Sequence, residues 1–263
     1  MTESLSLPDL VARIPDGAML VVPPEYSGVA VAATRTLLRR GVRGLHVLAA
    51  PTSGIQTDML IAAGCVATVE AAAITLGEFG TAPAFNAAVR AGTIRMLDST
   101  CPAIHAALNA AEKGLPFIPL RGLIGSDVLR HRADWKVTQN PFADAPDPIV
   151  LLPALYPDIA LFHAAAADRE GNVWIGRRRE LAVMAHAARR TLVTVERVLD
   201  TCFFDREELV AGALPALYVD AVAIAERGAW PLGLDEEYAP AAPALARYAA
   251  GTLFPQNQLA GAA

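Results

Sequence analysis

The sequence lacks the motifs that would place it in a metal, nucleotide or hydrolase class. Its three cysteines, Cys65, Cys101 and Cys202, are odd in number, far apart and outside any CxxC pair. This spacing indicates a reduced, cytoplasmic location rather than a disulfide scaffold. No HExxH motif or Cys/His cluster is present, so no metal site is expected. The absence of GxGxxG after the first predicted strand, of GxxxxGK[ST] and of GxSxG excludes a Rossmann fingerprint, a P-loop and an α/β-hydrolase elbow.

Membrane and nucleic-acid signals are also missing. The first ten residues carry neither a basic cluster nor a long apolar run, so we expect no signal peptide. The longest apolar region, residues 209–225, contains Pro215 and Asp220 and does not predict a membrane span. The net charge of −5 argues against non-specific nucleic-acid binding, which needs clustered Lys and Arg.

What the chain does have is enough apolar sequence for a large core. Hydrophobic residues make up 54% and charged residues 19% of its 263 residues. We therefore expect a single globular domain over residues 1–263. The mean hydropathy of +0.35 is high for a soluble monomer and suggests a surface buried against a partner.

Strand and helix signals alternate along most of the chain, which predicts an α/β fold with an open, mostly parallel sheet flanked by helices. The predicted strands are residues 18–22, 45–49, 65–69, 94–97, 149–152, 159–162, 192–195 and 217–224. The predicted helices are residues 29–40, 58–63, 84–90, 102–113, 178–190 and 236–249. Residues 121–148 are predicted to be irregular, and so long a loop favours a role in function or partner contact.

The apolar runs at 149–152 and 159–162 suit strands buried on both faces of the sheet. The second run ends at His163, and Asp168 to Asn172 supply turn residues after it. Ligands bind at the carboxyl ends of strands in such sheets, so this stretch is a candidate site. The alternative is that His163 caps a strand and Asp168 only closes a turn.

Glu78 is the main catalytic candidate. It lies between Gly77 and Gly80, beside Phe79 and before Pro83. A carboxyl group in apolar surroundings has a raised pKa and is suited to acid or base chemistry. The alternative is a structural carboxylate that accepts backbone N–H bonds in a turn.

Three further loops carry candidate binding residues. Ser53 and Gly54 lie between a strand and a helix, where backbone N–H groups can bind an anion, or where they form an ordinary capped loop. Gly125 and Ser126 lie in the long irregular region and either close over a ligand or partner or only cap a helix. Residues 177–179, three arginines, either receive a phosphate or form a solvated basic face.

The loop after the first strand, residues 22–28, reads Val-Pro-Pro-Glu-Tyr-Ser-Gly. In an α/β enzyme this loop is a prime location for a site. Glu25 and Ser27 are therefore candidate substrate-binding residues, with a structural role as the alternative.

Taken in order, these motifs resemble the alpha (A) subunit of family I coenzyme A transferases, the group that includes glutaconate and 3-oxoacid CoA-transferases. The resemblance covers roughly residues 15–200, and little is recognisable in the extension at 201–263. It is carried by Ser53-Gly54 with Asp58, Glu78-Phe79-Gly80 with Pro83, residues 110–119 with Gly125-Ser126-Asp127, and residues 157–160 leading to His163, Asp168 and Asn172.

The resemblance implies the open α/β fold that these enzymes share with ribose-5-phosphate isomerase-like proteins. It implies a heteromer in which a beta (B) subunit supplies the nucleophilic glutamate, coenzyme A enters as an acyl-CoA thioester, and CoA passes to an acceptor acid by covalent catalysis. In that scheme the A subunit shapes the pocket for the acyl group.

The chain departs from the family in one loop. The family usually has a glycine-rich GxGGF-like loop after the first strand, where this chain has Pro23 and Pro24. Two prolines remove backbone donors, so an anion site there is weaker or differently shaped. This leaves an alternative to transfer on the same scaffold, a hydrolase that opens rings of CoA thioesters, with Glu78 or Glu25 activating water. A third alternative is a non-catalytic metabolite-binding subunit, since related folds occur in sugar-responsive regulators.

Overall fold

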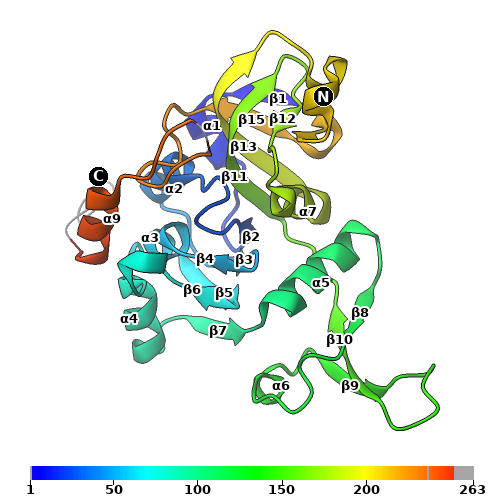
Figure 1. Cartoon of the computed structure of the whole chain (residues 1–263). Helices are drawn as coiled ribbons and strands as arrows, with labels where there is room; N and C mark the ends of the chain where they lie inside the picture. Colours follow the sequence, from blue (N-terminus) through cyan, green and yellow to red (C-terminus); the bar gives the residue numbers. More distant parts are fainter. Residues whose placement is uncertain (1, 236, 252–263) are drawn as a thin grey trace.

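The computed structural model describes residues 2–235 and 237–251 (Figure 1). A ten-stranded sheet forms its centre, in the order β1-β15-β13-β11-β2-β3-β5-β7, with β12 and β14 attached beside β11. All seven pairings along this path are parallel. The predicted class, an open and mostly parallel α/β sheet, is confirmed.

The bounds of the elements follow the predicted alternation closely in the first half of the chain. The strands of the central sheet are β1 (Glu3–Leu5), β2 (Met19–Val22), β3 (Leu45–Ala49), β5 (Val66–Ala71), β7 (Arg95–Asp98), β11 (Ile159–Asp168), β12 (Val173–Trp174), β13 (Arg190–Leu199), β14 (Ala213–Leu214) and β15 (Ala221–Ile224). The helices of eight or more residues are α2 (Val31–Arg40), α3 (Ile55–Ala62), α4 (Pro83–Ala91), α5 (Cys101–Glu112), α7 (Arg179–Ala187) and α9 (Ala242–Ala249). Short helices are α1 (Leu7–Ala12), α6 (Val128–His131) and α8 (Glu207–Val210), and short 3₁₀ turns are η1 (Gly77–Phe79), η2 (Phe203–Asp205) and η3 (Ala216–Tyr218).

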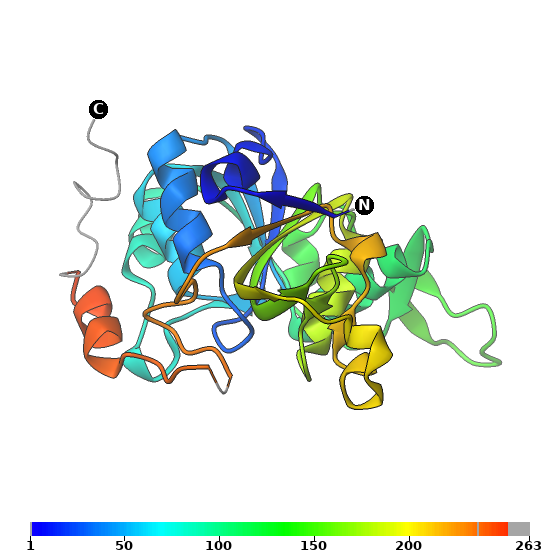
Figure 2. The ribbon, with the colours of Figure 1, turned by 90° about the horizontal axis from the view of Figure 1, so that it is seen from above.

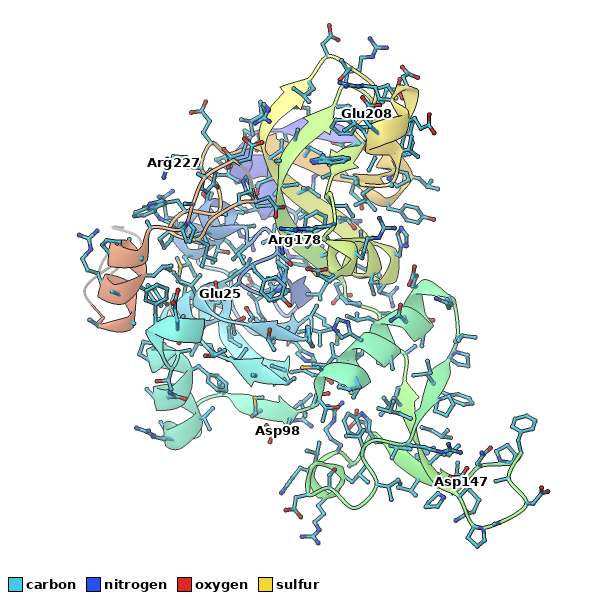
Figure 3. The ribbon with its side chains drawn as sticks, viewed as in Figure 1. Glu25, Asp98, Asp147, Arg178, Glu208 and Arg227 are labelled. Atoms are coloured by element: carbon cyan, nitrogen blue, oxygen red, sulfur yellow. The ribbon has the colours of Figure 1, made fainter. Side chains whose placement is uncertain are left out.

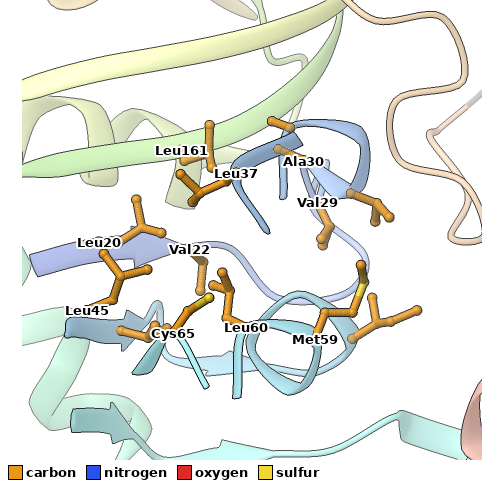
Figure 4. Packing of buried hydrophobic residues seen from close by; sticks show 14 of the residues in the cluster. Leu20, Val22, Val29, Ala30, Leu37, Leu45, Met59, Leu60, Cys65 and Leu161 are labelled. Carbon is orange, nitrogen blue, oxygen red and sulfur yellow. The ribbon is translucent and has the colours of Figure 1, made fainter. Parts of the chain in front are cut away.

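The central strands are apolar on both faces because helices cover both. Leu20 and Val22 of β2 belong to a core cluster with Leu37 of α2 and Leu60 of α3 (Figure 4). Val21, between them, belongs to a second cluster, which α5 and α7 close. Successive side chains of a strand point to opposite faces, so an apolar run of this kind can stay dry only between two helix layers.

The order of the strands reverses between β2 and β11. From β2 the chain adds β3, β5 and β7 in one direction, and from β11 it adds β13 and β15 in the other. The loop after β2 therefore turns away from β11 and leaves a crevice at the carboxyl ends of these two strands, where open α/β sheets bind ligands.

Three predicted boundaries were wrong. β11 does not stop at Phe162 but runs to Asp168, because β13 pairs with it over nearly its whole length. The strand predicted at 217–224 begins only at Ala221, after the 3₁₀ turn η3. The helix predicted at 236–249 is α9, which begins at Ala242; position 236 lies outside the described residues.

The turn after β11 confirms the structural interpretation of Asp168. Its Oδ1 accepts the N–H groups of Glu170 and Asn172, and its Oδ2 accepts those of Phe203 and of the Asn172 amide. With four donors, this buried carboxylate is fully used in closing the β11–β12 hairpin.

Residues 115–153 form an arm that projects from the central sheet in both views (Figures 1 and 2). The predicted irregular region at 121–148 and the predicted central strand at 149–152 are both corrected here. Strands β8 (Phe117–Leu120), β9 (Lys136–Gln139) and β10 (Pro148–Pro153) make a separate antiparallel sheet in the order β8-β10-β9. β10 is apolar because it is the middle strand of this small sheet, with one face against α5.

Arg132 anchors the arm to the central sheet. Its buried guanidinium is 2.8 Å from Glu70 of β5 and 2.7 Å from Asp134, and it donates to the Asp98 carbonyl. The guanidinium also lies 4.1 Å from the centre of the Trp135 ring. Because this guanidinium is buried and has several partners, moving the arm would leave a buried charge without its partner. The contacts of Arg132 therefore hold the arm in one position relative to the central sheet.

Candidate functional site

A cavity of about 930 Å³ lies at the crevice where the strand order reverses. Its walls come from the loop after β2, from η1, from the middle of β11, from the turn between β12 and α7, and from the C-terminal segment, which we define as the described residues of 226–251. In Figure 3 the labelled Glu25 and Arg178 lie in this central region, whereas Asp147 lies on the arm.

Glu25 is held at the amino end of α3. The backbone N–H of Ile55 donates to its Oε1, while its Oε2 is buried with no hydrogen-bond partner among the described residues. Burial raises the pKa of Glu25 to about 7, against the lowering effect of the Ile55 hydrogen bond, and Asp58 adds to the rise. Glu25 therefore changes protonation state near neutral pH at a cavity wall, which suits a proton-transfer group.

The expected anion site at Ser53 and Gly54 is filled from within the chain. The helix N-terminus that would bind an anion already binds the carboxylate of Glu25. Gly54 makes this possible, since a Cβ there would overlap the Glu25 carboxylate and the Thr75 carbonyl. Ser53 is buried and its Oγ accepts from Thr57, so neither residue belongs to the cavity wall.

Behind Glu25 lies a second buried carboxyl group, Asp58 of α3. It accepts the N–H of Phe85 at 2.8 Å and the hydroxyl of Tyr248 at 2.8 Å. Burial raises the pKa of Asp58 despite these bonds. Tyr248 comes from α9, so this pair ties the C-terminal segment to the element that holds Glu25.

Glu78 lies on η1, at the mouth of the same cavity. Its side chain is exposed, and it has no hydrogen-bond or ion-pair partner within residues 2–235 and 237–251. The alternative role for Glu78, a carboxylate that accepts backbone N–H bonds within its own turn, is not seen among the described residues. Glu78 and Glu25 thus line the same cavity, but Glu78 is exposed to solvent whereas Glu25 has a buried carboxyl group.

The other predicted binding residues are not brought into this wall. Ser27 is fully buried and its hydroxyl donates to Glu180 of α7. Gly125 and Ser126 lie on the arm, outside the cavity lining. Roles for these three residues in binding substrate or CoA stay predictions, and the cavity that holds Glu25 does not include them.

His163 is not a strand cap, because it lies inside β11 and is fully buried. Its Nε2 is 2.7 Å from Glu196 Oε1 and its Nδ1 is 2.9 Å from Thr194 Oγ1. A carboxylate can only accept, so with Glu196 ionised Nε2 carries a proton. Both partners come from β13, whose parallel register sets Thr194 beside His163.

Glu196 collects donors from the C-terminal segment. It accepts the Tyr238 hydroxyl at 2.8 Å and the N–H groups of Arg227 and Gly228 at 2.6 and 3.2 Å. Burial alone would raise its pKa, but these bonds and the one from His163 outweigh it and lower the pKa of Glu196 to about 2. Glu196 is therefore a fixed anion that fastens the described residues of 226–238 over the cavity.

Two ion pairs complete this fastening. Arg178 is 2.6 Å from Asp235, and Arg197 is 2.6 Å from Glu237. Of the three arginines at 177–179, Arg178 is thus engaged, Arg179 donates to the Ala211 carbonyl, and the exposed Arg177 makes no side-chain hydrogen bond or ion pair with the residues described. The solvated-face interpretation fits Arg179 and Arg177, but not Arg178.

Sequence reasoning found Glu25, Glu78 and His163 but missed Glu196 and Tyr238, the partners that complete the His163–Glu196–Tyr238 network. His163 and Glu196 are 33 residues apart, Glu196 and Tyr238 are 42 apart, and neither partner belongs to a motif. In the part of the chain that is described, no group of three or more His, Cys, Asp or Glu side chains is arranged to hold a metal ion. Over the same residues, none of the helices combines the length and the hydropathy needed to cross a membrane.

Comparison with known sequences gives a consistent family. Residues 5–225 match the family model described as Coenzyme A transferase. The chain is 32% identical to the A subunit of 3-oxoadipate CoA-transferase from Pseudomonas knackmussii, covering 76% of this chain and 72% of that protein. It is 30% identical to the cholesterol ring-cleaving hydrolase IpdA subunit of Rhodococcus jostii, covering 86% and 78%.

One relative is much longer. An uncharacterized protein of Archaeoglobus fulgidus is 34% identical over 225 residues, which is 84% of this chain but only 49% of that protein. The chain therefore spans about half the length of this relative.

Solved structures agree with the family. Glutaconate coenzyme A-transferase from Acidaminococcus fermentans superposes with a TM-score of 0.87 at 25% identity, over 98% of this chain and 86% of that one. A variant of the decarboxylase AibA/AibB gives a TM-score of 0.85 at 30% identity, over 98% and 97%. The same scaffold thus occurs in proteins named for transfer, hydrolysis and decarboxylation.

Proposed function

This chain belongs to the coenzyme A transferase family, and we propose that it is the A subunit of a heteromeric enzyme that moves CoA from an acyl-CoA thioester to an acceptor carboxylic acid. The observation that carries the proposal is the 930 Å³ cavity at the reversal of the strand order, formed by elements of this chain. The relative named for 3-oxoadipate is itself an A subunit, which supports a B-type partner. We also propose that residues 1–263 act as one domain of a cytoplasmic complex.

In this proposal a glutamate of the partner attacks the thioester carbonyl. The C–S bond breaks, CoA leaves as a thiolate, and an acyl-glutamyl anhydride forms. The thiolate then attacks the glutamyl carbonyl of the anhydride and releases the acyl group as a carboxylate. The acceptor acid reverses these two steps and leaves with CoA, so no metal or redox partner is required.

This chain contributes the acyl pocket. Glu25 and Glu78 face that pocket, and neither is proposed as the nucleophile. Glu25 is tethered to Ile55 with one oxygen buried, and Glu78 sits on a solvent-exposed turn. We propose that Glu78 contacts the reacting end of the substrate, because its carboxylate is unengaged by the described residues at the cavity mouth.

Hydrolysis of a CoA thioester is the second candidate, and Glu25 is the observation that favours it. A carboxyl group with a pKa of about 7 at a cavity wall is matched to taking a proton from water near neutral pH. Water oxygen would add to the thioester carbonyl, the C–S bond would break, and the thiolate would receive the proton. The IpdA relative is named a ring-cleaving hydrolase, so it supports hydrolytic chemistry in this family, and its name refers to a ring rather than to a thioester bond.

The first experiment is to purify the tagged chain from its native host and identify any stoichiometric partner by mass spectrometry. The complex is then assayed with acyl-CoA, with and without an acceptor acid. CoA transfer that depends on the acceptor, with a partner carrying a reactive glutamate, supports the first proposal. CoA release without an acceptor moves the conclusion to hydrolysis, and a chain that purifies alone contradicts the two-subunit proposal.

Glu78→Gln and Glu25→Gln then separate the roles of the two carboxyl groups. If Glu78 contacts the reacting groups, Glu78→Gln lowers kcat by roughly tenfold or more. Turnover within about twofold of the wild type would remove Glu78 from the mechanism. Glu207→Gln is the control, because Glu207 is an exposed glutamate outside the cavity lining.

A further inference from the structure

The charges on the cavity wall are unfavourable for an anionic acyl group. Six charged residues line it, of which two are arginines and four are acidic, namely Arg177, Arg178, Glu25, Glu78, Asp235 and Glu237. Arg178 is already neutralised by Asp235 at 2.6 Å, and Arg177 is exposed at the rim. Arg197 likewise neutralises Glu237, so the unpaired charged residues of the wall are Glu25 and Glu78 against Arg177. A second carboxylate inside the cavity would therefore meet Glu25 and no free buried cation among the described residues.

The enclosed part of the wall is mostly apolar, with Glu25 and His163 as its buried polar members. Six side chains that are each at most 8% exposed contribute to it, namely Leu76, Ile175, Leu181, Leu232, Leu234 and Leu245. The cavity volume of about 930 Å³ lies at the upper end of the range for pockets that bury a drug-sized ligand. A short acyl chain would leave most of this apolar surface without contact.

Resting on the proposed function, we infer that this cavity selects acyl-CoA substrates with a large acyl group whose far end is apolar and uncharged, in preference to short dicarboxylyl groups. This differs from the substrates for which the glutaconate and 3-oxoadipate relatives are named.

The C-terminal segment is the specificity element in this inference. It lies beyond residue 225, where the family match ends, yet it supplies Leu232, Leu234 and Leu245 to the wall. Three contacts fix it in place: Tyr238 to Glu196 at 2.8 Å, Arg197 to Glu237 at 2.6 Å, and Tyr248 to Asp58 at 2.8 Å. A wall held this firmly can discriminate by shape, because it does not collapse around a smaller group.

The test compares acyl-CoA thioesters on the complex copurified with its partner. Butyryl-, hexanoyl- and octanoyl-CoA form an apolar series, and glutaryl- and adipyl-CoA are the dicarboxylyl counterparts. Each methylene buried should raise kcat/KM roughly fourfold, so octanoyl-CoA, with four more methylenes, should exceed butyryl-CoA by roughly 250-fold. Octanoyl-CoA should also exceed adipyl-CoA by roughly tenfold or more.

Ala239→Phe tests whether the segment sets the size limit. Ala239 is exposed on the cavity wall, so a phenyl ring can take up cavity space without displacing the core. We expect kcat/KM for octanoyl-CoA to fall roughly tenfold or more while that for butyryl-CoA changes less than about threefold. Ala246→Phe is the matched control, since Ala246 is an exposed alanine of the same segment outside the cavity lining, and it should leave both values unchanged.

The outcomes are distinguishable. Equal or better turnover of glutaryl- or adipyl-CoA overturns this inference and leaves the proposed function standing. A uniform effect of Ala239→Phe on all thioesters, or none, overturns the role of the segment in specificity. No reaction with any thioester refutes the proposed function and this inference with it.

Discussion

Replacing Glu25 by glutamine should make the protein more stable, and more so as the pH rises. The folded state holds the Glu25 proton more tightly than the unfolded chain, because the pKa rises from 4.5 to about 7 on folding. The stabilisation from this proton is complete below pH 4.5 and is lost as the pH rises through 7. Above that pH the wild type must keep a charged carboxylate buried, which opposes folding.

The magnitude follows from the two pKa values. A difference between 4.5 and about 7 corresponds to roughly 3 kcal/mol of stability lost between about pH 4 and pH 8. Glutamine resembles the protonated acid, and its amide oxygen keeps the acceptor for the Ile55 N–H. For a chain of this size, about 3 kcal/mol is roughly 6–10 °C in Tm.

The assay is thermal unfolding of wild type and Glu25→Gln by circular dichroism, in matched buffers from about pH 4.5 to 8.5. The difference in Tm between variant and wild type should grow by several degrees from the acid to the alkaline end. Glu78→Gln, at an exposed carboxyl group, is measured in parallel as the second glutamate-to-glutamine variant. A difference for Glu25→Gln that stays flat across this range would refute the reasoning, because Glu25 would then titrate alike in folded and unfolded states.

Three other substitutions probe the frame around the site. Arg132→Leu should cost about 3–5 kcal/mol in urea unfolding, because it leaves Glu70 buried without its cation, and adding Glu70→Leu should recover most of that loss. Asp168→Ala should cost at least about 3 kcal/mol by the same method, since four buried donors lose their acceptor; a loss below about 1 kcal/mol would contradict its role in the hairpin. Tyr238→Phe removes a donor to Glu196, whose lowered pKa gives stability that is lost as the pH falls from 4.5 towards 2, so acid unfolding should begin at a higher pH. An unchanged acid midpoint would mean that Tyr238 does not hold the Glu196 charge.

The central sheet was predictable from the sequence because its signal is local. Residues 19–22 and 45–49 are apolar at every position or nearly so, and this pattern survives only in strands covered on both faces. The arm was not predictable in the same way. β10 has the same apolar run as a central strand, and only its pairing with β9 across a short loop and with β8, which precedes α6 in the chain, places it in another sheet.

The candidate site was predictable only for residues that stand out within a single short loop. Glu25 stands out after the first strand, and its exposed counterpart Glu78 stands out between two glycines. His163 and Glu196 meet through the register of β11 on β13, which no short motif encodes. Tyr238, expected within a helix over residues 236–249, lies before α9 instead, and only the folded chain brings it to Glu196.

One local arrangement, at the loop after β2 and the start of α3, combines Pro23, Pro24, Glu25 and Gly54. Pro23 and Pro24 offer no N–H to an anion, and the free N–H at the start of α3 is taken by the Glu25 carboxylate, for which Gly54 leaves room. Where the family usually has a glycine-rich loop, this chain therefore holds a tethered carboxyl group with a pKa of about 7. A glycine-rich loop can bind negative charge, whereas a tethered carboxyl group can transfer a proton. The protonation state of Glu25 is consequently the property on which the proposed hydrolase candidate depends.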